Sequence, residues 1–246
     1  MNINSSKMKK MNTYLWQITA KTNLHVGNEN STSYGIIDKA VQRDVLTELP
    51  CINASSLKGA INEFCCSTNA QGNEVMSAEN RKIIFGSDKK GDKKSFIKGQ
   101  AVFYDANILF LPVQDDEKLF KYATCAGVQK ILNDRLSMFA SKVDDINQFK
   151  RTGNREYKKL SDSMFATCCN DENLPIIARN VLENGESKNL WYEQVVPAES
   201  VFYAIIQEPE GDVLRKAING KIIQIGANAT VGYGYCKFEC VEMTKL

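Results

Sequence analysis

The chain has 246 residues, of which 43 % are hydrophobic and 24 % are charged, a composition that excludes a chain disordered throughout. Its 31 basic and 29 acidic side chains leave a net charge of +2, which neither requires nor excludes a nucleic-acid partner, because a nearly neutral protein can still carry a basic face. No apolar run approaches the roughly 18 residues of a membrane-spanning helix, and we expect a cytoplasmic protein that has no signal peptide and no membrane partner.

The first quarter of the chain predicts a strand, a long loop and a helix. Residues 13–20 are rich in aromatic and β-branched side chains, which is typical of a strand. Residues 21–50 carry few helix signals and predict a long loop, a feature that is more often functional than not in a compact domain. A helix is expected to begin at Ser55, with Ser55 or Ser56 as its cap and apolar residues at helical spacing after it.

The middle of the chain is more polar. Residues 65–98 predict an exposed loop, and the apolar stretch 99–113 predicts one or two strands that end at Pro112. A short helix is expected over residues 117–133. Residues 141–173 sustain no hydrophobic period and are expected to form a polar insertion.

The last third predicts a hairpin, a strand, a helix and a final strand. Residues 174–193 are interpreted as a hairpin with Asn184-Gly185 as its turn. Residues 201–207 predict a strand, and residues 211–220 predict a helix ended by Gly220. A glycine-rich turn then leads into the last strand. The order of elements predicts an α+β fold, an RRM-like or ferredoxin-like palm with large insertions, as a single domain over residues 1–246.

Eight cysteines and one histidine limit the possible chemistry. Two cysteine pairs are adjacent in sequence, Cys65–Cys66 and Cys168–Cys169, and adjacent residues rarely meet the geometry of a disulfide. The chain has no CxxC motif, and its only histidine is His25, which disfavours a zinc site or a Ser/His/Asp triad. We expect reduced, mostly buried cysteines.

Two groups of residues are candidates for binding an anion. Ser55, Ser56 and Lys58 would place two hydroxyls and an ammonium at the start of a helix, where backbone N–H groups favour a phosphate. The alternative is an ordinary capped helix with a solvated lysine. The glycine-rich stretch 225–234 would let a backbone approach closely, but it leads into a strand and is not a P-loop; the alternative is a glycine-rich hairpin.

The long loop holds the remaining candidates, His25, Asp38, Arg43 and Asp44. A loop carboxylate such as Asp38 can bind a divalent metal or orient a nucleophile, although a turn-forming or capping aspartate is the alternative. For His25, a structural histidine is the alternative to a catalytic one.

Several motifs along nearly the whole chain, taken together in their order, resemble one protein family. They are Leu24-His25-Val26-Gly27, Gly35-Ile36-Ile37-Asp38, Gln42-Arg43-Asp44, Pro50-Cys51-Ile52, Ser55-Ser56-Leu57-Lys58-Gly59, residues 99–106, Leu111-Pro112-Val113, residues 122–125, Leu190-Trp191-Tyr192-Glu193 and the glycine loop 226–234. The chain resembles the RAMP superfamily of CRISPR proteins, and in particular the backbone subunit of type III-B (Cmr) effector complexes. It departs from the usual family pattern at Lys39-Ala40, Asn53-Ala54, Asn62 and Ala227.

The resemblance implies an RRM-like palm with a β-hairpin thumb, expected within residues 174–195. It implies that several copies stack along a CRISPR guide RNA, beside other subunits of the Cmr complex, and cleave complementary single-stranded target RNA at regular intervals. Asp38 is the implied catalytic and metal-binding residue, with Mg²⁺ or another divalent cation. The implied RNA-binding residues are His25, Arg43, Ser55, Ser56, Lys58, Gly226, Gly232 and Gly234.

Two other functions stay open from the sequence. The first is a structural RNA-binding RAMP subunit that does not cleave. The second is a RAMP endoribonuclease that processes CRISPR precursor RNA, although such enzymes often use histidine as a general acid or base.

Overall fold

The computed structural model of the chain describes residues 10–27, 37–69, 71–87, 97–152 and 156–246, and its central feature is one large sheet. The strands of this sheet are β1 Met11–Ala20, β2 Cys51–Ile52, β3 Val102–Phe103, β4 Ala106–Val113, β5 Lys121–Cys125, β7 Tyr157–Leu160, β10 Val201–Pro209, β11 Ile222–Gln224 and β12 Tyr235–Val241. They lie in the order β11-β12-β1-β10-β4-β5-β7, with β2 beside β4 and β3 beside β10. A short pair, β6 Ser141–Lys142 and β13 Thr244–Lys245, lies outside this sheet.

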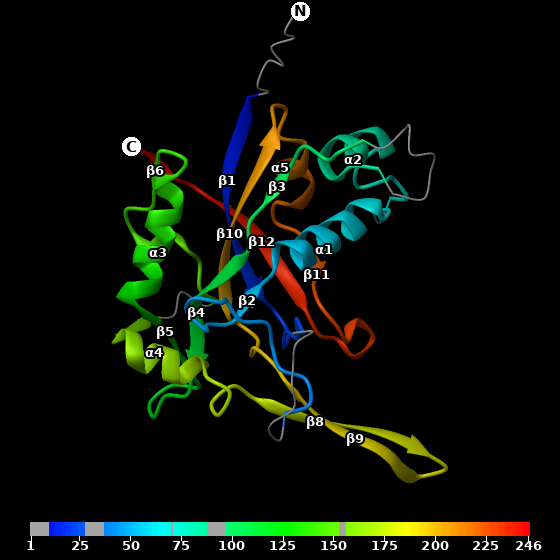
Figure 1. Cartoon of the computed structure of the whole chain (residues 1–246), viewed down its shortest axis with the longest axis vertical. Coiled ribbons are helices and arrows are strands. Elements are labelled where there is room, and N and C mark those ends of the chain that lie inside the picture. Colours follow the sequence, from blue (N-terminus) through cyan, green and yellow to red (C-terminus); the bar gives the residue numbers. More distant parts are fainter. Residues whose placement is uncertain (1–9, 28–36, 70, 88–96, 153–155) are drawn as a thin grey trace, which may run out of the picture.

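Five α-helices accompany the sheet in the described part of the chain. They are α1 Ala54–Cys66, α2 Ala78–Phe85, α3 Ala126–Ser137, α4 Asp162–Cys169 and α5 Val213–Ile218, and two 3-10 turns cover Ile146–Gln148 and Ala229–Val231. Helices α1, α2 and α5 lie on one side of the sheet and α3 and α4 on the other (Figure 1). None of the helices in the described ranges has the length and apolar character needed to cross a bilayer.

The centre of the sheet confirms the expected ferredoxin-like topology. The chain runs β1–α1–β4–β10–α5–β12, and these four strands lie side by side as β12-β1-β10-β4, each antiparallel to its neighbour. The register of β1 against β10 runs from Met11 opposite Pro209 to Thr19 opposite Val201. The first six residues of β10 are buried because helices or loops cover both faces of the sheet, which explains why this strand reads as a continuous apolar run.

A hairpin projects from this body, as the sequence predicts. Strands β8 Ile176–Glu183 and β9 Glu186–Gln194 pair with each other and extend away from the helices and the sheet (Figure 1). Asn184 (φ 51°) and Gly185 (φ 85°) both adopt positive φ, which a two-residue type I′ turn requires. The hairpin lies within the segment 174–195 expected for the thumb.

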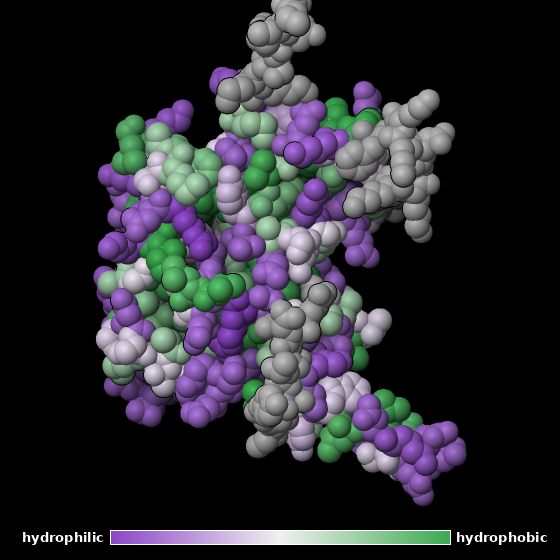
Figure 2. Space-filling model, in the orientation of Figure 1, coloured by the Kyte–Doolittle hydropathy of each residue, from purple (hydrophilic) through white to green (hydrophobic). Residues whose placement is uncertain are grey.

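The hairpin is hydrophilic at its tip and more apolar along its length (Figure 2). Its exposed apolar side chains include Val181, Leu182 and Leu190.

Two sequence-based expectations for the middle of the chain are wrong. Residues 117–133 do not form one helix: Lys121–Cys125 is β5, whose last four residues are buried, and α3 starts only at Ala126. The apolar residues fitted the helical period by chance, because a buried strand and the helix after it contribute to the same pattern. The strand β4 also runs past the expected stop, since Pro112 lies opposite Tyr122 and the strand ends at Val113.

The polar segments contain more structure than expected. Helix α2 forms within the expected loop 65–98: Ser77 caps it by accepting the N–H of Asn80, and it buries Ile84 and Phe85. The polar insertion 141–173 contains β7, which extends the sheet, and α4, which buries Phe165 and Cys169. These short helices each bury two side chains, which is too few to produce a visible period. Parts of two predicted loops, residues 28–36 and 88–96, lie outside the described residues.

All eight cysteines are unpaired, in agreement with the sequence. Cys51, Cys65, Cys125, Cys169 and Cys236 are buried, and Cys66 is the one that is exposed. Burial raises the pKa of the Cys65, Cys169 and Cys236 thiols to about 12, so these are inert apolar side chains at neutral pH.

Candidate functional site

Asp38 lies against the base of the hairpin. The backbone N–H of Asp38 donates to the carbonyl of Tyr192 at 3.0 Å, and the N–H of Tyr192 donates to Oδ2 of Asp38 at 2.7 Å. The next residue, Lys39, extends the contact through Gln194, whose N–H donates to the Lys39 carbonyl at 2.9 Å. Asp38 itself is exposed. The loop therefore pairs with β9 and holds one carboxylate at the surface in a fixed orientation.

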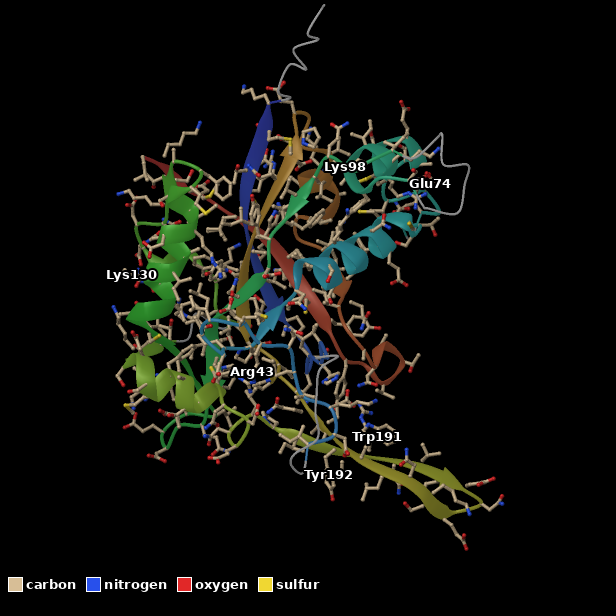
Figure 3. All side chains as sticks on the ribbon, in the orientation of Figure 1. Arg43, Glu74, Lys98, Lys130, Trp191 and Tyr192 are labelled. Carbon is tan, nitrogen blue, oxygen red and sulfur yellow. The ribbon has the colours of Figure 1, made fainter. Side chains whose placement is uncertain are left out.

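Aromatic and cationic side chains gather around the same hairpin base. Trp191 and Tyr192 lie where the hairpin leaves the body (Figure 3). Lys39 Nζ lies 5.1 Å from the centre of the Trp191 ring, and the Arg179 guanidinium lies 4.6 Å from the centre of the Tyr233 ring. Paired aromatic and cationic groups of this kind suit stacked bases and phosphates.

His25 is buried, with 3 % of its surface exposed. Its Nδ1 lies 2.7 Å from the carbonyl oxygen of Gln194, and its Nε2 lies 3.4 Å from Oε1 of Glu193. This environment agrees with the structural interpretation of the histidine. Its contact with RNA stays a prediction.

Glu193 is the centre of this buried group. The side chain of Glu193 is 1 % exposed. Besides His25, its carboxylate accepts the Asn228 side-chain N–H at 2.5 Å and lies 3.3 Å from Nε of Arg179. These contacts join the long loop, both strands of the hairpin and the glycine-rich loop.

The glycine-rich loop packs against the long loop. The N–H of Ala227 donates to the His25 carbonyl at 3.0 Å, and the N–H of Gly234 donates to the Asn23 carbonyl at 2.9 Å. Gly226 and Gly234 have positive φ values of 81° and 78°, and a Cβ on either would clash with a backbone carbonyl, of His25 and of Ile225 respectively. Gly226 is therefore needed for the close approach of the two loops, and Gly234 is needed for the tight turn within the glycine-rich loop.

Gly232 differs from these two glycines. Its φ is 84°, but a Cβ there would meet no atom of the described residues within 4 Å. Of the three glycines, Gly232 is therefore the one with the most open surroundings in the part of the chain that the structure describes.

The start of α1 differs from the expected serine cap. The N-cap residue is Asn53, and the helix begins at Ala54, whose N–H donates to Oδ1 of Asp105 at 2.6 Å. The expectation that Ser55 or Ser56 caps the helix is therefore wrong, because a carboxylate from the β3–β4 connection takes this position instead. Ser55 is exposed, and Ser56 and Lys58 are partly exposed at the same end of the helix. The predicted phosphate site thus holds two hydroxyls and a lysine beside an acidic cap.

Arg43 makes contacts within the protein. Its guanidinium donates to the carbonyls of Glu48 and Cys169 at 2.7 and 2.8 Å and to Oδ1 of Asp171 at 2.6 Å. These bonds tie the long loop to the segment after α4 (Figure 3). Its contact with the guide stays a prediction.

Asp44 forms a local turn. Its Oδ1 accepts the backbone N–H groups of Leu46 and Thr47 and the hydroxyl of Thr47. Although burial raises it, the pKa of this carboxyl stays below its usual value because of the bonds from Thr47 and Leu46. Asp44 therefore acts as a turn-forming aspartate.

The side chains around Asp38 supply only some of the ligands that a metal ion needs. No group of three His, Cys, Asp or Glu side chains is arranged to hold a metal among the residues that the structure describes. Glu193 follows Tyr192 in the chain, but its carboxylate is buried among protein partners. Magnesium in proteins is often held by one or two carboxylates together with substrate phosphates. The residues present fit a magnesium ion that Asp38 and RNA oxygens would hold jointly.

Sequence reasoning missed Glu193, Arg179 and Asn228. Glu193 stands in the quoted motif Leu190-Trp191-Tyr192-Glu193, but nothing in that motif assigns it a role. The contacts of Glu193 with Asn228 and with His25 join segments more than 30 residues apart, and no local pattern records them.

The chain is similar to known proteins over nearly its whole length. Residues 17–237 match the model of the RAMP superfamily. Among curated proteins, the chain is 26 % identical to the CRISPR system Cmr endoribonuclease Cmr4 of Pyrococcus furiosus, across 95 % of this chain and 97 % of that protein.

Solved structures share the fold. Oligomeric Cmr4 from Pyrococcus furiosus matches with a TM-score of 0.67 and 21 % identity, over 95 % of this chain and 98 % of that one. A chain of the type III-B Cmr-beta complex bound to cognate target RNA matches with a TM-score of 0.71 and 20 % identity, over 93 % and 97 % of the two chains.

Proposed function

The chain belongs to the RAMP superfamily, and we propose that it is the backbone subunit of a type III-B (Cmr) CRISPR ribonucleoprotein that cleaves target RNA. Its partners would be a CRISPR guide RNA, complementary single-stranded target RNA, further copies of itself and other Cmr subunits. Similarity to Cmr4 over nearly the full length of both proteins supports this function. The observation that carries it is the exposed Asp38 carboxylate, held by Tyr192 at the base of the projecting hairpin.

The hairpin and the carboxylate would act together on the target strand. A projecting hairpin that enters a guide–target duplex would interrupt base pairing and turn one nucleotide outward. An unpaired nucleotide can bring its 2′-hydroxyl into line with the adjacent phosphorus more easily than a stacked one. Asp38 would then lie beside the distorted linkage, and orientation alone can supply a large part of the rate enhancement.

Asp38 would serve the cleavage step through its negative charge. When bound there, Mg²⁺ would supply electrostatic stabilisation of the charge that develops on the phosphate oxygens. Asp38 would hold the ion from the protein side, and its bond from the Tyr192 N–H fixes the orientation of its carboxylate. The shortage of histidine is no obstacle, because this step needs a charged oxygen and correct strand geometry.

The guide would be bound through its backbone. Ser55, Ser56 and Lys58 at the start of α1 provide hydroxyls and a positive charge for a phosphate, and the open surroundings of Gly232 allow an RNA backbone to approach the glycine-rich loop. Contacts of this kind carry no sequence preference, as a subunit that accepts any guide requires.

The test uses the chain purified with its guide RNA and partner subunits. Labelled target RNA complementary to the guide is added with and without Mg²⁺, and the products are resolved at single-nucleotide resolution. A ladder of evenly spaced products that requires the metal is the expected result. Tight target binding without cleavage would indicate a non-cleaving structural subunit. Cutting of precursor RNA by the isolated chain without metal would indicate a processing endoribonuclease.

A further inference from the structure

A cluster of buried and half-buried ionisable side chains lies next to the strand segment that holds Asp38. Glu193 is 1 % exposed and His25 is 3 % exposed, and the Arg179 side chain is 20 % exposed. Buried charges are costly unless they are paired, so a cluster like this persists only when it has several partners. The three residues come from β9, the long loop and β8, and Asn228 adds the glycine-rich loop.

Glu193 connects these segments directly to the segment that holds Asp38. It stands between Tyr192, which bonds the Asp38 backbone and carboxylate, and Gln194, which bonds the Lys39 backbone. One edge of this short stretch of β9 therefore fixes Asp38 and Lys39. The side chain in its middle is anchored in the protein interior. The anchor of Glu193 is thus one residue away from the backbone N–H that orients Asp38.

The cluster is electrostatic and only partly hydrogen-bonded. Nε of Arg179 and Oε2 of Glu193 lie 3.3 Å apart, yet among the described residues neither has a well-aligned hydrogen-bond partner. The Arg179 guanidinium is also placed over the Tyr233 ring. The contacts from the hairpin to the glycine-rich loop are the bond from Asn228 to Glu193 and the packing of Arg179 over Tyr233, so an ionised side chain takes part in each.

We propose that Glu193, with His25 and Arg179, is a positioning residue that fixes the hairpin base against the glycine-rich loop and so sets where the Asp38 carboxylate lies. The expected effect on cleavage rests on the proposed function. The anchoring of residues 191–194 is a structural claim and is independent of the proposed function. Glu193 does not touch RNA, because it is buried, and it acts through the backbone of Tyr192.

The test compares the same change at a buried and at an exposed glutamate. Glu193→Gln removes the buried charge and keeps the shape of the side chain. Glu117→Gln is the matched control, because Glu117 is exposed between β4 and β5, away from the hairpin, and pairs only loosely with Lys121, at 3.7 Å. Both variants are assembled with guide RNA and partner subunits and compared with the wild-type complex.

Two readouts are measured. The first is backbone hydrogen exchange of peptides covering residues 189–195 and, as an internal reference, β10. The second is single-turnover cleavage, with the distribution of cut positions. Glu193→Gln should accelerate exchange at 189–195 about tenfold without changing β10, because local opening no longer breaks the ionic contacts. Cleavage should slow by about 10-fold to 100-fold, with cuts spread over neighbouring linkages, at unchanged target affinity. Glu117→Gln should match the wild type in both.

The outcomes separate the inference from the proposed function. Wild-type exchange at 189–195 in the Glu193→Gln complex, with wild-type cut positions, overturns the inference. If the wild-type complex does not cleave at all, the proposed function fails, and the exchange readout alone decides the anchoring. If Glu193→Gln does not assemble, Arg179→Lys is measured with the same two readouts, because it keeps the positive charge and changes only the geometry of the contact. Faster exchange at 189–195 then supports the inference, and wild-type exchange with wild-type cut positions overturns it.

Discussion

The carboxylate of Asp38 and the backbone of Tyr192 hold each other in both directions: the Tyr192 N–H donates to Oδ2 of Asp38 at 2.7 Å, and the Asp38 N–H donates to the Tyr192 carbonyl at 3.0 Å. These residues are far apart in sequence. One belongs to the long loop and the other to the base of the hairpin. The relationship explains how an exposed loop residue keeps a defined orientation relative to the element proposed to distort the target RNA.

The start of α1 predicts opposite effects of two substitutions on guide binding. Lys58→Ala should weaken the binding and reduce the slope of log affinity against log salt concentration by about 1, because one phosphate contact is lost. Asp105→Asn should strengthen the binding by about twofold to fivefold, since it removes a negative charge beside the proposed phosphate and keeps an oxygen for the Ala54 N–H. Salt titrations of guide affinity measure both. A tighter Lys58→Ala complex, or an Asp105→Asn complex that binds less tightly than wild type, would place the phosphate elsewhere.

Arg43 should contribute to stability through the three bonds that it makes. Arg43→Ala leaves the carbonyls of Glu48 and Cys169 without this donor, and we expect a loss of about 1–3 kcal/mol in the free energy of unfolding, measured by urea denaturation. Lys130→Ala on α3 is the control, because Lys130 is exposed and its loss should change the stability little. Equal stability of the two variants, with a guide-binding defect confined to Arg43→Ala, would favour a direct RNA contact instead.

The three glycines of the glycine-rich loop should respond differently to alanine. Gly232→Ala meets only the strain of positive φ, about 1–2 kcal/mol, because its surroundings are open. Gly226→Ala and Gly234→Ala add a clash with a backbone carbonyl, so both should destabilise the protein more than Gly232→Ala does. Thermal or urea unfolding ranks the three variants. If all three lose the same stability, the close packing of the two loops is not essential.

The carboxyl of Asp212 predicts a dependence of stability on acid pH. Hydrogen bonds from Tyr14 and Asn12 lower its pKa from 3.8 to about 2. A carboxyl whose pKa is lower in the folded protein stabilises the fold above its unfolded pKa, and that contribution is lost as pH falls through the folded value. Asp212→Asn should therefore be less stable than the wild type at pH 6, and the difference should disappear between about pH 4 and pH 2. A difference that is constant over this range would mean that the charge of Asp212 contributes nothing.

Local patterns in the sequence predicted the elements that form the centre of the fold. Strand β1, helix α1, the hairpin turn at Asn184-Gly185 and strand β10 each carry a strong signal of their own, either a period, a turn pair or an apolar run. The motifs quoted for the family placed Asp38 and the glycine-rich loop among the candidates. These features depend on residues that are close together in the sequence, so they can be predicted from the sequence alone.

Contacts between distant segments could not be predicted in this way. The cap of α1 comes from Asp105, 51 residues further along the chain, and the partner of His25 is Glu193. The boundary between β5 and α3 also failed, because apolar residues of a buried strand fell into phase with the helix after it. Such features are set by how the segments pack against each other.

The central claim is that the Asp38 carboxylate supports cleavage of guide-bound target RNA. Asp38→Asn tests it most directly, because the amide oxygen still accepts the Tyr192 N–H while the negative charge is lost. Single-turnover cleavage should fall by about 100-fold or more in the assembled complex with Mg²⁺, with guide and target affinities unchanged. Cleavage by this variant at the wild-type rate and spacing would contradict the claim.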